Sequence, residues 1–190
     1  MNRRDWIVVL FVCLCSAAGL AQGQTKQEAH KSEPSTFYPD DENRGFDEAT
    51  LPSNTVLDAL LKTHEAKENW DRLKTLDRER LRKLFLVSKV HLAESGETDE
   101  VVLGSDPMSG ADCYWFWIVR DKGERARVLL FTNNYGIDLL NTRTNGYREI
   151  RGVWSSAAGY SITRLYRYDG SRYRLAYERT HQELPPKAKP

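Results

Sequence analysis

The feature that most restricts the fold of this chain is a series of short strand-like segments, separated by turn residues, between residues 84 and 179. Residues 84–91 alternate between two faces, as a strand does, and residues 113–119 are apolar on both faces, which predicts a central strand. Asn145-Gly146 is a strong signal for a two-residue hairpin turn. We expect strands at residues 84–91, 101–103, 113–119, 127–132, 137–140, 147–154, 162–168 and 172–179.

Two helices are expected before this series of strands. Ser53 or Asn54 provides an N-cap for a helix whose apolar residues recur at helical spacing, and Asp77 provides one for a second, shorter helix. The sequence therefore predicts an α+β fold with one or two N-terminal helices. Its main part is an antiparallel β-meander of about eight strands that curls into a half-barrel or a sandwich.

The N-terminus has the pattern of a cleavable signal peptide, residues 1–21. Arg3 and Arg4 precede an uncharged apolar run, and small residues lead to a cleavage site after Ala21. The apolar run is shorter than the roughly 20 residues that a membrane-spanning helix needs. We therefore expect a periplasmic or secreted protein, exported by the general or the twin-arginine route, with no transmembrane segment after cleavage.

Composition divides the rest of the chain into three parts. Residues 22–50 are polar and contain few large apolar side chains, so we expect a flexible, disordered leader. Residues 51–182 contain all the expected helices and strands and are long enough for one hydrophobic core, which predicts a single β-rich domain. Residues 183–190 are rich in proline and lysine, so we expect a flexible tail.

Charge is unevenly distributed along the chain. The formal net charge of the whole chain is +1, which argues against a dedicated nucleic-acid-binding protein. Residues 22–119 have an excess of acidic side chains, whereas residues 120–179 have an excess of basic ones. Two explanations remain open: a surface for a charged partner, or attraction between two regions of one fold.

The sequence contains no pattern that is typical of a metal or cofactor site. His30, His64, His91 and His181 do not have the spacing of metal ligands, and Cys113 is the single cysteine after the signal peptide. We therefore expect no metal, no cofactor and no internal disulfide. Cys113 could be buried, reactive or paired with a second molecule, and the sequence leaves these roles open.

The last predicted hairpin has an aromatic face and a basic face. We take Asp169-Gly170 as its two turn residues. In that register Tyr166 faces Tyr173 on the aromatic face. Arg167 faces Arg172 on the opposite face, where like charges require acidic neighbours or a bound anion.

The arginines of this region form the candidate binding site. Guanidinium groups bind carboxylates and phosphates, so a sheet face that carries them would suit an acidic envelope protein, a polyanionic glycan or an anionic lipid. The alternative is a solvated face whose arginines pair with acidic residues of the same chain. The predicted site residues are Arg148, Arg167, Arg172 and Arg174.

Two other candidate sites compete with more ordinary interpretations. Trp115, Trp117 and Trp154 could line a sugar-binding platform, but aromatic residues that alternate on central strands belong more often to the core. Ser155 could act as a hydrolase nucleophile with one of the histidines, although no nucleophile motif surrounds it.

The C-terminal part of the chain also carries two motifs. Residues 144–150 read Thr-Asn-Gly-Tyr-Arg-Glu-Ile, and residues 166–173 read Tyr-Arg-Tyr-Asp-Gly-Ser-Arg-Tyr. They resemble the signature of a family of small, signal-peptide-bearing, largely uncharacterised bacterial proteins, Asn-Gly-Tyr-x-acid-aliphatic followed by Tyr-x-aromatic-Asp-Gly-x-x-Tyr. The resemblance covers roughly residues 100–178 and implies a fold rather than an activity. It also implies a cysteine at Cys113 and a second one near the last strand, where this chain has none, so no family disulfide is expected here.

The sequence thus favours a non-enzymatic binding domain, exported from the cytosol, that engages an acidic partner through a basic sheet face. It does not identify the ligand. A cell-envelope hydrolase of unrecognised type and a purely structural interaction module remain as alternatives.

Overall fold

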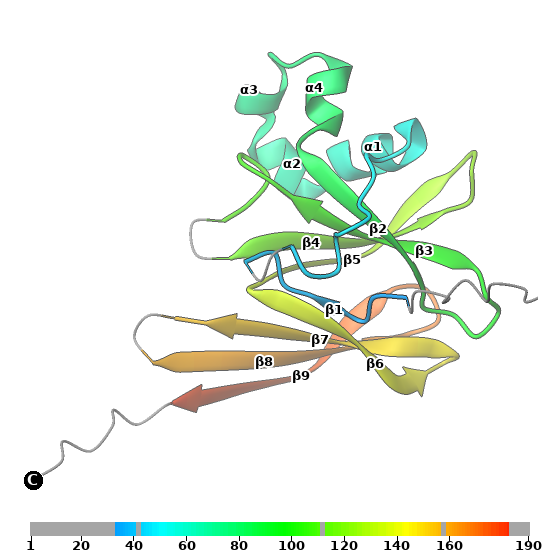
Figure 1. The fold of residues 1–190 in the computed structure, drawn as a ribbon, viewed down its shortest axis with the longest axis vertical. Coiled ribbons are helices and arrows are strands. Elements are labelled where there is room, and N and C mark those ends of the chain that lie inside the picture. Colours follow the sequence, from blue (N-terminus) through cyan, green and yellow to red (C-terminus); the bar gives the residue numbers. More distant parts are fainter. Residues whose placement is uncertain (1–32, 41–42, 111–112, 157–158, 183–190) are drawn as a thin grey trace, which may run out of the picture. The chain divides into compact units, whose positions relative to one another are not determined.

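The computed structural model describes residues 33–40, 43–110, 113–156 and 159–182. The predicted signal peptide, the first part of the predicted leader and the predicted tail lie outside these residues. The described residues form an α+β fold with four short helices and nine antiparallel strands in two sheets, which confirms the predicted fold class (Figure 1). Within them, no helix is both long and apolar enough to span a membrane.

Consecutive strands form the four-stranded sheet, in the order β2-β3-β4-β5. Along β4, Phe116 and Ile118 face the second sheet, whereas Trp117 and Val119 face the helices. The prediction of a central strand is confirmed, and Trp117 belongs to the core rather than to an exposed platform. The strands are β2 (Phe85–His91), β3 (Thr98–Gly104), β4 (Tyr114–Asp121) and β5 (Ala126–Asn134).

The five-stranded sheet has the order β1-β6-β7-β8-β9. The predicted hairpin turn at Asn145-Gly146 joins β6 to β7, and both residues have the positive φ angles, 51° and 77°, that such a turn requires. The predicted strands at residues 127–132 and 137–140 do not pair as a hairpin, because β5 continues to Asn134 and the chain crosses to the other sheet at Tyr135. The strands are β1 (Thr36–Phe37), β6 (Gly136–Thr144), β7 (Tyr147–Ser155), β8 (Tyr160–Tyr168) and β9 (Tyr173–Gln182).

The helices cover the face of the four-stranded sheet that is turned away from the five-stranded sheet (Figure 1). Two begin at the predicted N-caps, where Ser53 Oγ accepts a hydrogen bond from the Val56 amide and Asp77 Oδ1 accepts one from the Arg80 amide. The other two were not predicted, because each is too short for a periodic pattern. The helices are α1 (Asn54–Leu61), α2 (His64–Glu68), α3 (Trp70–Leu73) and α4 (Arg78–Arg82).

The described part of the predicted leader, residues 33–40 and 43–50, is part of the fold, so for these residues the expectation of a flexible leader is corrected. Phe37 is fully buried, and its ring contacts that of Phe46 edge-on at a centroid distance of 5.3 Å. Thr50 exchanges two backbone hydrogen bonds with Val87, each 2.9 Å long. Two buried aromatic side chains and this short pairing anchor a segment whose composition is otherwise polar.

Candidate functional site

The five-stranded sheet has one covered face and one open face. Its covered face packs against the four-stranded sheet through Ile137, Ile150 and Tyr166. None of the described helices packs on the opposite face, which we call the open face (Figure 1). Because neighbouring residues of a strand point to opposite faces, residues next to the buried ones in sequence point to the open face.

Cross-strand pairing places Asp138, Arg151, Leu165 and Tyr177 in one row across the open face. Arg151 donates two hydrogen bonds to Asp138 Oδ2, from Nε at 3.0 Å and from Nη2 at 2.8 Å. Leu165 is half-buried, and Tyr177 is 46% exposed. The row thus combines a neutralised ion pair with accessible apolar surface.

Two predicted site residues, Arg167 and Arg174, lie opposite each other on the open face. Each has an acidic partner, as the like-charge pair requires: Arg167 Nε lies 2.8 Å from Glu149, and Arg174 Nε lies 2.9 Å from Asp169. Both guanidinium-bearing side chains remain more than half exposed, at 53% and 56%. Their guanidinium groups are therefore accessible to a further anion while the ion pairs within the chain stay in place.

The acidic partners are held in their charged form. Hydrogen bonds from Thr144 and Thr142, together with the Arg167 ion pair, lower the pKa of Glu149. The backbone amide of Arg172, the Arg174 guanidinium and a further backbone amide lower the pKa of Asp169 below its usual range. Neutralisation of Arg167 and Arg174 within the chain is therefore maintained over the ordinary pH range.

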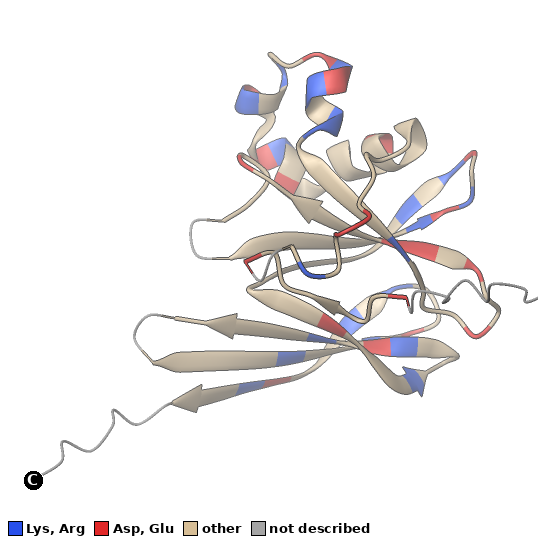
Figure 2. Cartoon of the chain, viewed as in Figure 1, with Lys and Arg blue, Asp and Glu red and all other residues tan. Residues whose placement is uncertain are grey.

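Two further arginines of this region form no ion pair with another described residue. Arg172 is an exposed residue of the turn between β8 and β9 rather than of a strand. Arg179 is exposed on β9, opposite Thr163, and points to the open face beside Tyr177. Figure 2 shows basic bands on β8 and β9 next to an acidic band on β9.

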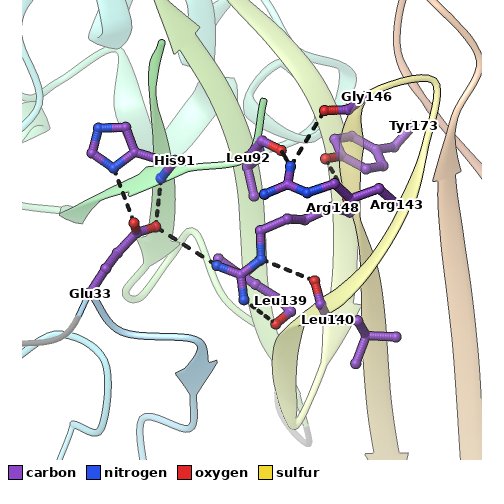
Figure 3. Close-up of polar contacts among 9 residues, drawn as sticks. All are labelled: Glu33, His91, Leu92, Leu139, Leu140, Arg143, Gly146, Arg148 and Tyr173. Atoms are coloured by element: carbon purple, nitrogen blue, oxygen red, sulfur yellow. Dashed lines mark hydrogen bonds and ion pairs between the residues drawn. The ribbon is translucent and has the colours of Figure 1, made fainter. Parts of the chain in front are cut away.

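Arg148, the fourth predicted site residue, does not share the open face with the others. Its side chain is only 11% exposed. The guanidinium donates to the backbone carbonyls of Leu139 and Leu140 and lies 3.9 Å from the Glu33 carboxylate (Figure 3). Tyr173 donates its hydroxyl proton to the Arg148 carbonyl at 2.9 Å. Arg148 therefore fills the irregular part of the β6–β7 pairing, and its role in these contacts is structural.

The predicted register of the last hairpin is wrong by two residues. The Asp169 carboxylate accepts hydrogen bonds from the amides of Ser171 and Arg172, which makes a four-residue turn and pairs Tyr168 with Tyr173. Because a shift by two residues keeps every side chain on the same face, the inward aromatic face at Tyr168 and Tyr173 is nevertheless present.

Sequence reasoning missed Tyr177 and Arg179 as members of the open face. The register shifts at Leu165/Tyr166, where Ala176 is the extra residue of a bulge on β9. A regular strand would place Tyr177 on the inner face with Tyr173, and the bulge moves it to the open face. The sequence Asp169-Gly170-Ser171 indicates the longer turn, because an aspartate side chain can accept hydrogen bonds from the amides that follow it. Nothing in the sequence indicates the bulge.

The residues of the hydrolase alternative do not assemble in the described part of the chain. His64 pairs with Glu68 on α2, and His91 pairs with Glu33 beside β2. Ser155 lies in a row with Ser161 and His181, at the exposed ends of β7, β8 and β9. No hydrogen bond joins this serine to this histidine, and no described acidic residue orients the imidazole.

No group of three metal-ligating side chains occurs among the described residues. Cys113 lies directly before β4 and is partly buried.

Comparisons of the chain with protein-family models, with curated proteins and with solved structures gave no match in any of the three.

Proposed function

We propose that this protein is a non-enzymatic binding domain, periplasmic or secreted, whose open sheet face engages an acidic partner. Export rests on the signal-peptide pattern of residues 1–21, and the binding mode rests on the open face. The partner is an acidic protein surface, with a polyanionic glycan as the alternative.

The observation that carries the proposal is the charge of the open face. The outward positions of β6–β9 present Arg151, Arg167, Arg174 and Arg179. In those positions the carboxylates are Asp138 and Glu149, both already engaged with arginines. A positive excess thus remains on a face that no described helix covers, and Arg179 has no ion-pair partner in the described part of the chain.

The accessible side chains between these arginines fit a protein partner. Tyr177 and Leu165 lie next to each other in the row described above, and Tyr177 presents 46% of its surface. Binding interfaces are enriched in tyrosine and arginine, because both combine large contact area with polar groups. A partner that brings carboxylates to the arginines would bury this tyrosine at the same time.

The test uses a double charge reversal, Arg172→Glu/Arg174→Glu, in the purified protein. Both side chains are exposed, so the fold is expected to tolerate the change. The matched control is Arg125→Glu/Arg127→Glu in the β4–β5 hairpin, which makes the same change in net charge on the other sheet. The probe is poly-L-glutamate, and the measurement is its dissociation constant at several salt concentrations.

We expect the open-face variant to bind poly-L-glutamate about tenfold more weakly than the unmodified protein, and the control to bind almost unchanged. Affinity should fall as salt rises, because exposed charges are screened beyond a distance of about 8 Å at physiological ionic strength. Equal losses in the two variants would mean that only net charge matters, and this result would overturn the proposal.

A further inference from the structure

The outer edge of β9 has no backbone partner in the described fold. β9 is 10 residues long and ends the sheet order β1-β6-β7-β8-β9, with β8 on one side. All its residues after Tyr173 are exposed. On its other side, no described residue forms a hydrogen bond with the backbone of β9. Such an edge presents a row of amide and carbonyl groups that an extended chain can pair with.

Parts of the other edges are occupied by specific contacts. Thr50 pairs with Val87 at the edge of β2, and the Glu33 carboxylate accepts a hydrogen bond from the His91 amide there (Figure 3). On the side of β6 away from β7, the two-residue strand β1 pairs with Ile137 and Asp138.

Near the end of β5, the outer strand of the four-stranded sheet, Arg164 Nη1 donates to the Asn133 carbonyl at 3.0 Å. β9 is the longest strand of the described fold and has no contact of this kind with a described residue on its free side, so it offers the longest row of unpaired backbone groups.

The side chains of β9 define the chemistry of a strand that could pair there. After the Ala176 bulge the strand is regular, and Tyr177 and Arg179 point to the open face. Glu178 points to the other face and is neutralised by Arg164 at 2.7 Å. An added strand would therefore meet an unpaired cation on one face, and an acidic residue opposite Arg179 would be favoured.

We propose that an extended, acidic segment of a partner protein adds to β9 as a further antiparallel or parallel strand of the five-stranded sheet. The proposal rests on the function proposed above and specifies its mode. Backbone hydrogen bonds along the edge supply affinity, and Arg179 with Tyr177 selects the side chains of the partner.

A second copy of this chain meets like-charge contacts at this edge in two of its symmetric registers. Two copies of β9 that pair antiparallel around Glu178 place Glu178 opposite itself, and pairing around Arg179 places Arg179 opposite itself. Like charges directly opposite each other destabilise a sheet. An acidic partner strand avoids both conflicts.

The experiment uses the purified protein and a blocked peptide in which glutamate alternates with valine. Two N-methylated forms of the peptide serve as matched probes, each methylated at alternate nitrogens, so that each loses the donors of one edge only. Binding is measured by fluorescence anisotropy, and hydrogen exchange is followed at the amides of residues 177–182. The protein variant is Arg179→Glu, and its control is Arg127→Glu on β5.

Strand addition predicts that one N-methylated form fails to bind and that the other binds like the parent peptide. It also predicts that amides of β9 exchange about tenfold more slowly with peptide bound, and that Arg179→Glu weakens binding about tenfold while the control does not. If both methylated forms bind equally and β9 exchange is unchanged, strand addition is wrong, while arginine-dependent binding of poly-L-glutamate would still support the proposed function. Concentration-dependent dimers with protected β9 amides in the absence of peptide would assign the edge to a second copy and would also overturn this proposal.

Discussion

The two sheets of this domain differ in how much of their surface they bury. The four-stranded sheet is covered on both faces, and on β4 the successive residues Phe116, Trp117, Ile118 and Val119 are all fully buried. The five-stranded sheet is covered on one face, and on β9 only Tyr173 is buried. Since burial of apolar surface is the main source of folding free energy, most of the stability of the described fold resides in the four-stranded sheet and in the layer between the sheets.

The arginine–carboxylate pairs follow the same division. Between the sheets, Arg120 binds the fully buried Asp99 at 2.9 Å, and its guanidinium lies 4.8 Å from the centre of the Tyr147 ring. On the open face, Arg167 binds Glu149 at 2.8 Å but keeps 53% of its side chain in solvent. The first pair belongs to the interior, whereas the second leaves its cation accessible to a partner.

The largest expected effect compares these two pairs. Arg120→Met leaves the Asp99 carboxylate buried without its cation, so we expect the free energy of unfolding to fall by about 3–5 kcal/mol. Arg167→Met leaves Glu149 with its hydrogen bonds from Thr142 and Thr144, and the loss should stay within about 1 kcal/mol. Urea unfolding of both variants at neutral pH measures the difference. Losses of equal size would show that the open face is as much a part of the core as the layer between the sheets.

The sequence was sufficient to predict those parts of the fold that depend on local patterns. Eight of the nine described strands were predicted near their positions, as were the Asn145-Gly146 turn and the N-caps at Ser53 and Asp77, because periodicity, turn chemistry and capping act within a few residues. The two-residue strand β1 was missed, since it is too short for a periodic pattern. The division of the strands into two sheets at Tyr135 was not predicted, since two neighbouring strands of different sheets look like a hairpin in sequence.

The candidate site was predictable only in part, for related reasons. Arg167 and Arg174 were placed on one face correctly in spite of the register error, because that error was an even number of residues. Arg148 was misplaced, since its contacts with the Leu139 and Leu140 carbonyls depend on an irregularity in strand pairing that the sequence does not encode locally. Arg179 was missed because of the Ala176 bulge.

A second prediction concerns Glu100, a buried acidic residue of β3. Burial, reinforced by the charge of Asp121 and opposed by that of Lys89, raises the pKa of Glu100 from its usual 4.5 to about 7. One of its carboxylate oxygens has no hydrogen-bond partner among the described residues. The neutral form is therefore favoured in the folded state, so its contribution to stability is complete below pH 4.5 and is lost as pH rises through about 7.

Substitution of this acid removes the pH dependence that it causes. At about 1.4 kcal/mol per pH unit, we expect the unfolding free energy of the unmodified protein to fall by about 3 kcal/mol more than that of Glu100→Gln between pH 4.5 and pH 8. Urea unfolding of both proteins across this range measures the difference. Parallel curves for the two proteins would show that folding does not raise the pKa of Glu100.

The smallest expected effect is on the open face itself. Tyr177→Thr removes an aromatic ring that no covering layer packs against, and threonine retains a high propensity for strands. We therefore expect the unfolding free energy to change by no more than about 0.5 kcal/mol, measured by urea unfolding, while the affinity for the glutamate–valine peptide falls. A side chain whose loss costs binding but not stability is one that the fold itself does not need. A loss of stability as large as that of a core substitution would instead place Tyr177 in a packed interface within the chain, and the open face would not be free for a partner.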